Sequence, residues 1–362
     1  MVSNRNVKKN ILLLDSSNEL DSHVEFNSTF IRTVLKIEPD VDLAMHTGHY
    51  NRLNIKQNRA KLVFTKFKEN NSIIKQVLNG VKIARVTSKY QRVIVLSIDR
   101  YSFLSLLVLG FLRGLTRPKI VIIHHAWLSQ LKYSKLIFFS VVRSTGKFRN
   151  IVLGNWIIES LHRFGIDECE LIPHPLPLRL KVPKNTSEGK RYRLAYLGNA
   201  HENKGFDVFA RLASSLRDNV KLEFFVIGKR GDYVTDLEMA HNIEFNCVEA
   251  TSGNDFLSEV AKCDLVVFPF PVDRYELYCS GVVFDCISQE IPFVFLKGNI
   301  MLNHLHTEFN LGERMDDFES LCCFIDNLNS TALAELNRKY YNQDLLLELK
   351  GFANKVEKIF NE

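Results

Sequence analysis

Residues 193–207 read RLAYLGNAHENKGFD, an apolar run that leads into a glycine and, a few residues later, a lysine. The apolar run predicts a buried β-strand, and the residues from Phe206 onward have the spacing of a helix. Gly198 lets the backbone turn close to a ligand. Lys204 and Gly205 stand where a helix with free N–H groups begins, a position that favours phosphate. This stretch therefore predicts a strand–turn–helix unit with an anion site; the alternative is an ordinary turn with Lys204 in solvent.

The same alternation of short apolar runs and longer amphipathic stretches extends along the chain. It is typical of parallel sheets whose strands are buried on both faces and joined by helices. Strands are predicted at 10–15, 92–97, 119–124 and 150–153, and then at 193–197, 222–227, 243–245, 264–268 and 292–296. The two groups indicate an α/β protein with two doubly wound parallel sheets.

A proline-rich stretch separates the two groups of strands. Residues 173–190 hold four prolines and no hydrophobic period, which is typical of a linker. We expect an N-terminal domain at 1–178, a linker at 179–190 and a C-terminal domain at 191–343. A helix at 344–362 is expected to pack back toward the N-terminal domain. Ligands of doubly wound sheets bind beyond the carboxyl ends of the strands, so the two domains should face each other across a cleft.

Composition excludes several classes of protein. Hydrophobic residues make up 46% and charged residues 24%, as in ordinary globular proteins. The longest apolar run, 103–112, is much shorter than the roughly 20 residues of a spanning helix, and the first ten residues lack the apolar core of a secretory signal. The 7 cysteines form no CxxC pair, which favours free thiols in a reducing compartment. We therefore expect a cytoplasmic protein.

Charge is divided unevenly along the chain. Residues 1–190 hold 30 Lys and Arg against 14 Asp and Glu, whereas 191–362 hold 17 against 27. The stretch 132–149 mixes bulky apolar residues with cations and, with the cations of 56–92, fits docking onto an anionic membrane surface. Ordinary core packing and a solvated basic face are the alternatives. No nucleic-acid motif accompanies the charge, so we expect no nucleic-acid partner.

The pattern G-x5-K-G-x-D at 198–207 resembles the GT-B glycosyltransferases, in particular those of family 4. In these enzymes the lysine, here Lys204, binds the diphosphate of the donor. The resemblance implies two Rossmann-like domains over nearly the whole chain. Family members generally have an arginine directly after the glycine, where this chain has Asn199. Arg230, in the turn after the next predicted strand, is the candidate substitute.

Residues 275–291, YELYCSGVVFDCISQEI, resemble the E-x7-E block of the same enzymes. Asp285 stands where the second glutamate binds the ribose, and a carboxylate can accept hydrogen bonds from two vicinal hydroxyls. The first glutamate is replaced by Leu277, and Glu276 is one position off, so it is either a catalytic contact to the donor sugar or a surface carboxylate. Ser280 and Gly281, at the predicted helix start, can offer backbone N–H groups to the β-phosphate.

The N-terminal half contributes polar residues at predicted strand ends. His124 and His125 end a buried strand, where histidine needs partners, and the resemblance implies a contact with the transferred sugar. A structural role is the alternative for either ring. Candidates on the acceptor side follow the predicted strands at 10–15 and 92–97: Ser16, Ser17, His23, Glu25 and Asp99. Among these residues Glu25 is a candidate general base, as is the neighbouring Asp15.

The resemblance implies a hexosyltransferase that uses a nucleotide-diphosphate sugar, UDP- or GDP-linked, without metal or other cofactor. The acceptor would be a glycan or lipid-linked glycan in polysaccharide biosynthesis, such as lipopolysaccharide or capsule, at the inner face of the cytoplasmic membrane. Two alternatives stay open. A nucleotide-sugar epimerase shares the architecture, and the degenerate E-x7-E block leaves a non-catalytic nucleotide-sugar-binding partner of a transferase possible.

Overall fold

The computed structural model divides the chain into two compact units. One comprises Met1–Pro175 with Leu277–Cys279 and Gly351–Glu362, and the other comprises Leu176–Glu276 and Ser280–Lys350. The structure describes residues 9–16, 24–53, 55, 60–64, 72–112, 119–125, 128–129, 148–177, 191–228, 243–246, 253–339 and 351–361. The predicted linker at 179–190 lies outside these residues.

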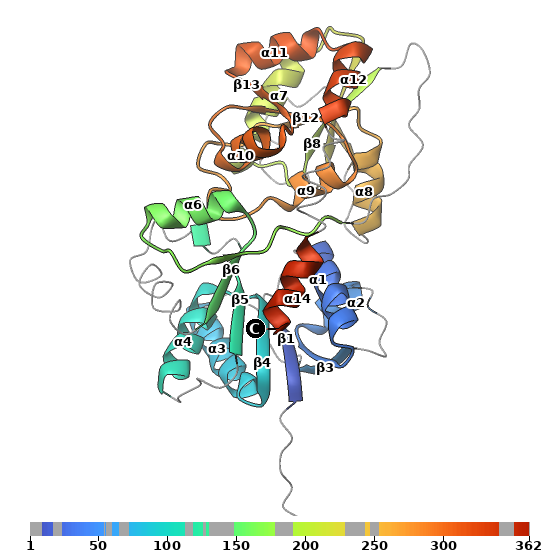
Figure 1. Ribbon diagram of the computed structural model, residues 1–362. Coiled ribbons are helices and arrows are strands. Elements are labelled where there is room, and N and C mark those ends of the chain that lie inside the picture. Colours follow the sequence, from blue (N-terminus) through green and yellow to red (C-terminus); the bar gives the residue numbers. More distant parts are fainter. Residues whose placement is uncertain are drawn as a thin grey trace, which may run out of the picture. The chain divides into compact units, whose positions relative to one another are not determined.

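The N-terminal unit is built on a parallel sheet of seven strands in the order β3-β2-β1-β4-β5-β6-β7 (Figure 1). The strands are β1 (Lys9–Asp15), β2 (Val41–Ala44), β3 (Ala60–Phe64), β4 (Tyr90–Ser97), β5 (Lys119–Ile123), β6 (Arg149–Val152) and β7 (Glu170–Leu171). Strand order reverses between β1 and β4, which is the point where doubly wound sheets bind ligands.

Helices cover both faces of this sheet. They are α1 (Val24–Ile37), α2 (Thr47–Arg52), α3 (Ile73–Thr87), α4 (Arg100–Leu112), α6 (Asn155–Arg163) and α14 (Phe352–Asn361). One face carries α1 and the C-terminal α14, whose Phe352, Val356 and Ile359 enter the same core as Phe30. The Phe30 and Phe352 rings meet edge to face at 5.9 Å. The last helix of the chain thus completes the core of the N-terminal unit.

The C-terminal unit has a parallel sheet of six strands in the order β10-β9-β8-β11-β12-β13. The strands are β8 (Tyr192–Leu197), β9 (Leu222–Ile227), β10 (Ile243–Asn246), β11 (Leu265–Phe268), β12 (Phe293–Leu296) and β13 (Glu313–Met315). Here the order reverses between β8 and β11. The sequence 193–207 therefore forms the first strand and turn at the second reversal point of the protein.

The helices of this unit again lie in two layers (Figure 1). They are the 3-10 helix η2 (Glu202–Lys204), α7 (Phe206–Ser215), α8 (Gly253–Ala261), α9 (Gly281–Ser288), α10 (Ile300–Phe309), α11 (Phe318–Asp326) and α12 (Ser330–Lys339). Apolar residues of α7, α11 and α12 share one core with Leu194 and Tyr196 of β8, and α8 and α9 pack against each other. No helix among the described residues is long and apolar enough to cross a bilayer.

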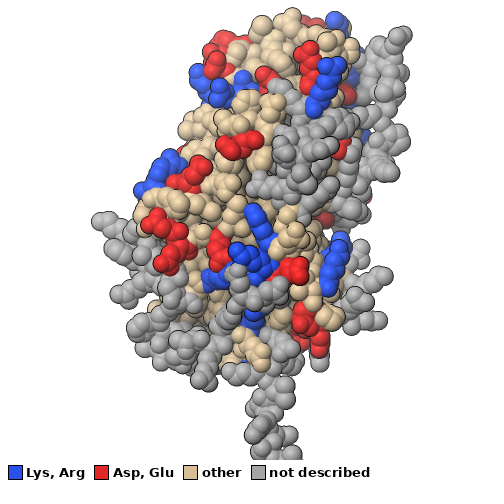
Figure 2. Space-filling view, in the orientation of Figure 1, with Lys and Arg blue, Asp and Glu red and all other residues tan. Residues whose placement is uncertain are grey.

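Charges of both signs lie side by side on the face seen in Figure 2. In the N-terminal unit, for example, Arg149 forms an ion pair with Glu170. Most of the stretch 132–149, predicted to dock onto anionic lipid, lies outside the described residues, so that docking surface stays a prediction.

Candidate functional site

Two glycines shape the turn between β8 and α7. Gly198 has a φ of +97° and Gly205 a φ of +74°, both in the region that side chains other than glycine avoid. A Cβ atom on Gly205 would lie only 1.8 Å from the carbonyl oxygen of Pro269. The start of α7 therefore packs directly on the backbone that follows β11, and only glycine allows this approach.

The same turn directs Lys204 back over the end of β8. The Tyr196 hydroxyl donates to the carbonyl oxygens of Asn199, at 3.1 Å, and Lys204, at 3.4 Å, and so joins the two ends of the loop. A Cβ atom built on Gly198 would lie 3.8 Å from Lys204 Nζ and 3.5 Å from Val282 Cγ1. The ammonium group and the first turn of α9 thus border the space beside Gly198.

Helix α9 adds its N-terminus and a carboxylate to this space. Ser280 is the N-cap residue, but its side chain does not cap the helix, which begins at the exposed Gly281. Asp285 is half-buried and lies three residues after Val282, so the two share one face of the helix. The structure therefore places Lys204 Nζ and the first turn of α9 beside Gly198, and Asp285 follows one helical turn after Val282. Such an arrangement would suit an anion with a hydroxyl-bearing group beside it.

Glu276 lies in the loop that leads from β11 to α9. It is half-buried and follows Tyr275, whose backbone has a left-handed φ of +65°. The next residue, Leu277, is buried, as an apolar side chain in that position should be. Glu276 is thus the carboxylate nearest in sequence to the position where the E-x7-E block has its first glutamate.

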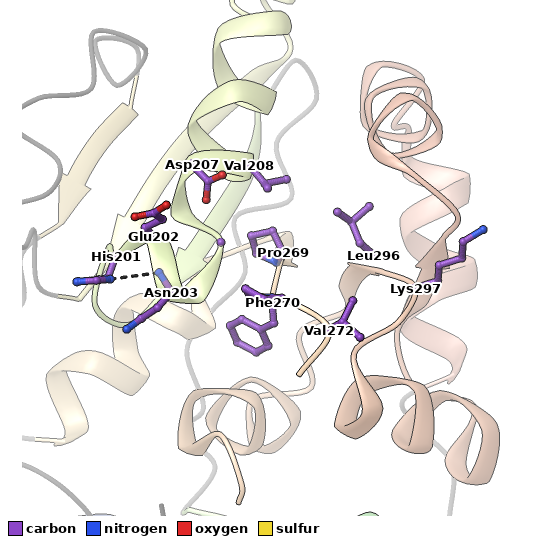
Figure 3. Close-up of a pocket in the computed structure, with 12 residues that line it drawn as sticks. His201, Glu202, Asn203, Asp207, Val208, Pro269, Phe270, Val272, Leu296 and Lys297 are labelled. Carbon is purple, nitrogen blue, oxygen red and sulfur yellow. Dashed lines mark hydrogen bonds between the residues drawn. The ribbon is translucent and has the colours of Figure 1, made fainter. Parts of the chain in front are cut away.

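A pocket of about 580 Å³ lies next to the β8–α7 turn. Its lining consists of His201, Glu202, Asn203, Gly205, Asp207, Val208, Pro269, Phe270, Pro271, Val272, Leu296 and Lys297. Figure 3 shows the polar side chains of the turn on one side and Val272, Leu296 and Lys297 on the other. Neither Lys204 nor Asp285 lines it, so this pocket is distinct from the space beside Gly198.

His124 follows β5 and is 1% exposed. Asn150 donates to the carbonyl oxygen of Phe148, so its Oδ1 is the acceptor for His124 Nε2 at 2.7 Å. Burial lowers the pKa of His124 to about 4, against the opposing effect of the Asn150 hydrogen bond. The ring is therefore neutral at pH 7, with its proton on Nε2.

His125 belongs to a cluster of rings at the carboxyl ends of β5 and β7. Its ring meets Phe26 of α1 edge to face at 4.8 Å, and Phe26 also contacts His174 at 5.5 Å. His174 Nδ1 donates to the carbonyl oxygen of Pro175 at 2.9 Å. In the sequence, His174 belongs only to the proline-rich stretch 173–190, and no local motif indicates that it shares Phe26 with His125.

A buried polar group of three residues lies at the end of β1. Asn27 Nδ2 donates to Asp15 Oδ2 at 2.6 Å and lies 2.9 Å from His49 Nε2, and all three residues are at most 2% exposed. Burial of Asp15 keeps its carboxylate from solvent, which argues against a role as general base in this conformation. His49 was not predicted, because nothing in its local sequence distinguishes it.

No protein-family model and no curated sequence matches the chain. Solved structures do match. HepE of Anabaena in complex with UDP-glucose has a TM-score of 0.68 at 13% identity, with 97% of this chain and 99% of that chain covered. Sucrose-phosphate synthase of Thermosynechococcus elongatus has a TM-score of 0.67 at 12% identity, covering 98% of both chains. The chain has the GT-B fold. The lipopolysaccharide outer core galactosyltransferase WaaB is also similar in structure, with a TM-score of 0.62 at 13% identity over 97% of this chain and 99% of that one.

The predicted donor residues of this GT-B chain that the structure describes all belong to the C-terminal unit, and Lys204 lies beside Gly198 there. Asn199 accepts the Tyr196 hydrogen bond with its backbone carbonyl oxygen, and a contact of this residue with phosphate stays a prediction. Arg230, the predicted substitute for the missing arginine, lies outside the described residues. Among the residues that the structure does describe, no group of three or more His, Cys, Asp or Glu side chains is arranged to hold a metal ion.

The predicted acceptor-side residues of the GT-B chain have diverse surroundings. Ser16 is buried, and its N–H donates to the carbonyl oxygen of Ser97 at 3.0 Å. Glu25, in the first turn of α1, has its pKa raised by burial and lowered to a smaller extent by Arg32. Ser17 and His23 lie outside the described residues.

Asp99 has a structural role in this GT-B chain. Its carboxylate accepts a hydrogen bond from the Ser102 N–H at 3.0 Å, and the Ser102 hydroxyl lies 2.8 Å from the carboxylate and 2.7 Å from the carbonyl oxygen of Gln76. The N–H contact caps the start of α4, and the one proton of the Ser102 hydroxyl is shared between the carboxylate and Gln76. The acceptor-side role of Asp99 stays a prediction that these contacts do not favour.

Proposed function

We propose that this chain is a glycosyltransferase whose C-terminal unit holds a nucleotide-diphosphate sugar, UDP- or GDP-linked. The observation on which this proposal depends is the position of Lys204 Nζ and Val282 on two sides of the space at Gly198. A cation and a helix N-terminus around an open glycine suit a diphosphate. The presence of UDP-glucose in the similar HepE structure supports a donor of this class.

The same residues account for the chemistry without a metal ion. In sugar transfer, an acceptor hydroxyl oxygen bonds to the anomeric carbon while the bond from that carbon to the diphosphate oxygen breaks. Negative charge then builds up on the leaving diphosphate. The Lys204 ammonium and the N–H groups of α9 would stabilise that charge, because they are fixed before the reaction begins. Asp285 would accept hydrogen bonds from the ribose hydroxyls.

The N-terminal unit would receive the acceptor, which we propose to be a glycan or lipid-linked glycan in polysaccharide biosynthesis at the inner face of the cytoplasmic membrane. The basic composition of residues 1–190 supports an acceptor or surface with negative charge. His125, with its ring against Phe26, and Glu25, with its raised pKa, are the candidates for sugar contact and proton acceptance. A carboxyl with a raised pKa is the better base near neutral pH.

One specific observation favours a second candidate, a non-catalytic protein that binds a nucleotide-sugar. Leu277 occupies the position of the first glutamate of the E-x7-E block and is buried. Such a protein would bind the donor without turnover, and turnover therefore distinguishes the two functions.

A thermal-shift screen with UDP-, GDP-, dTDP- and ADP-sugars tests donor binding first. A ligand at about 100 times its Kd should stabilise the fold by about 2.7 kcal/mol. Nucleotide release is then measured with and without glycan and lipid-linked acceptors. Acceptor-dependent release supports the transferase, whereas binding without release supports the second candidate. No stabilisation by any nucleotide or nucleotide-sugar would overturn both.

A further inference from the structure

The loop from Pro269 to Ser280, between β11 and α9, contains Glu276 and has no strand partner of its own. A loop of this length needs bonds from elsewhere to keep one conformation. Part of it is a turn in which the Arg274 N–H donates to the carbonyl oxygen of Pro271 at 3.1 Å. The chain leaves the C-terminal unit directly after Glu276, because Leu277–Cys279 belong to the other unit. The position of Glu276 therefore depends on what holds this turn.

Asn299, the N-cap residue of α10, holds this turn from outside the loop. Its side chain is fully buried, and its Nδ2 donates to the carbonyl oxygens of Pro271, at 2.9 Å, and Arg274, at 2.8 Å. Its Oδ1 accepts from the Leu302 N–H at 3.2 Å and so caps α10. Both amide donors and the amide oxygen are therefore in use, which fixes the orientation of the side chain.

The helix alone does not require an asparagine here. An N-cap needs only an acceptor oxygen, and aspartate or serine serves as well as asparagine. The two N–H donors of Asn299 act on the loop and have no function for α10. The residue that follows the second bonded carbonyl is Tyr275, with its φ of +65°. A left-handed tyrosine persists only where its surroundings enforce it, and its buried ring packs against Phe270 at 4.8 Å.

We propose that Asn299 is a positioning residue: by clamping the Pro271 and Arg274 carbonyls it enforces the left-handed turn at Tyr275 and so sets the direction of Glu276 toward the donor sugar. This inference rests on the proposed function for the role of Glu276, but not for the clamp itself. As a positioning residue, Asn299 touches neither donor nor acceptor. It acts only through the loop.

The substitution Asn299→Asp separates the two tasks of the side chain. The carboxylate keeps an acceptor for the Leu302 N–H but has no donor for the two carbonyls. Asn299→Ser is the uncharged counterpart, because the hydroxyl can cap α10 while being too short to bridge both carbonyls. The matched control is Asp317→Asn, the reverse exchange at the N-cap of α11, where the side chain accepts from Ser320 and bonds only its own helix.

Amide hydrogen exchange and kinetics are measured on the full chain for all four proteins. In both Asn299 variants we expect exchange across residues 272–276 to be at least about tenfold faster, with α10 unchanged. We expect kcat to fall by about tenfold to a hundredfold, because small misplacements near the reacting atoms have effects of that size, while the Kd for free nucleotide changes less than about twofold. As the pH falls, the Asn299→Asp carboxyl gains a proton and one donor, so its kcat relative to wild type should recover.

Unchanged exchange at 272–276 in both variants would overturn the clamp. Faster exchange with wild-type kcat would overturn the positioning role, as would equal loss of kcat in Asp317→Asn. If the wild-type protein releases no nucleotide under any condition, the proposed function fails separately, and the exchange measurement still decides whether Asn299 holds the loop.

Discussion

Lys204 Nζ lies 3.8 Å from the point where a Cβ atom of Gly198 would be. This distance is an ordinary van der Waals contact, so a methyl group on Gly198 would fit there and would occupy the space between the amine and α9. Glycine thus has two functions at this position. It adopts the left-handed turn, and it leaves open the volume in which we expect the diphosphate to bind.

Lys204→Ala should weaken nucleotide-sugar binding while leaving the fold intact. A hydrogen bond to a charged group contributes about 1.5–3 kcal/mol, so Kd should rise roughly 10- to 150-fold in calorimetric titration. The control is Lys297→Ala in the same unit, since Lys297 is exposed and pairs with Asp316 at 3.1 Å. Equal affinity in the wild type and Lys204→Ala would remove Lys204 from the site.

Gly198→Ala and Gly205→Ala should differ in a defined way. Both substitutions strain a left-handed backbone, which costs about 1–2 kcal/mol. At Gly205 the new Cβ would also lie 1.8 Å from the Pro269 carbonyl oxygen, so the backbone must move and the loss of stability should be larger. Urea unfolding measures this difference. Gly198→Ala should be the milder change in stability but should still reduce nucleotide affinity, and the opposite ranking of stabilities would contradict the packing described.

The sequence predicts the centre of each sheet better than its edges. All nine predicted strands form, because continuous aliphatic runs such as 10–15 and 222–227 are typical of strands buried on both faces. The strands that were not predicted are β2, β3, β7 and β13, and the last three lie at sheet edges. Edge strands are short or less apolar because one side has no neighbouring strand, so periodicity gives little signal there.

Among the residues of the candidate site, some were predicted from local motifs and others were not. Motif spacing predicts Gly198, Lys204 and Asp285 as donor residues, since a turn and a helix start fix relative positions within one short stretch each. Of these residues, the structure places Lys204 Nζ beside Gly198. His49 and Asn299 were not identified, because their partners lie 22 to 28 residues away in sequence and the contacts exist only in the folded chain. For Asp99, by contrast, the spacing to Ser102 is a helix N-cap signal that local sequence already contains.

Asn27→Ala should destabilise the N-terminal unit markedly. The substitution removes the donor that lies 2.6 Å from Asp15 Oδ2 and leaves a buried carboxylate without that bond. Loss of a buried partner of a charged group costs on the order of 2–3 kcal/mol or more, measurable by urea unfolding. Asn203→Ala, at an exposed position, is the control and should change stability by less than about 0.5 kcal/mol. Similar stability of the two variants would show that the Asp15 group contributes little.

The neutral state of His124 should make stability fall in mild acid. Its pKa in the folded protein is about 4, below the ordinary value of 6.5, because burial disfavours the charged ring. Between pH 6.5 and pH 4, the histidine of the unfolded chain therefore binds a proton, whereas the buried ring of the folded protein does not. The contribution is present above pH 6.5 and is lost as the pH falls toward 4, and it amounts to about 3 kcal/mol over the full window.

Urea unfolding at pH 7, 5.5 and 4.5 measures this loss, and His124→Gln isolates it. Glutamine keeps an N–H donor for Asn150 but does not titrate, so the variant should lose about 2 kcal/mol less than the wild type between pH 7 and 4.5. The absolute stability of the variant at pH 7 does not affect this comparison. Only the change of unfolding free energy with pH is compared between the two proteins. If the unfolding free energies of the two proteins fell equally with pH, His124 would take up a proton in the folded state. The ring would then be available as an acid near neutral pH, contrary to the buried, Asn150-bonded geometry.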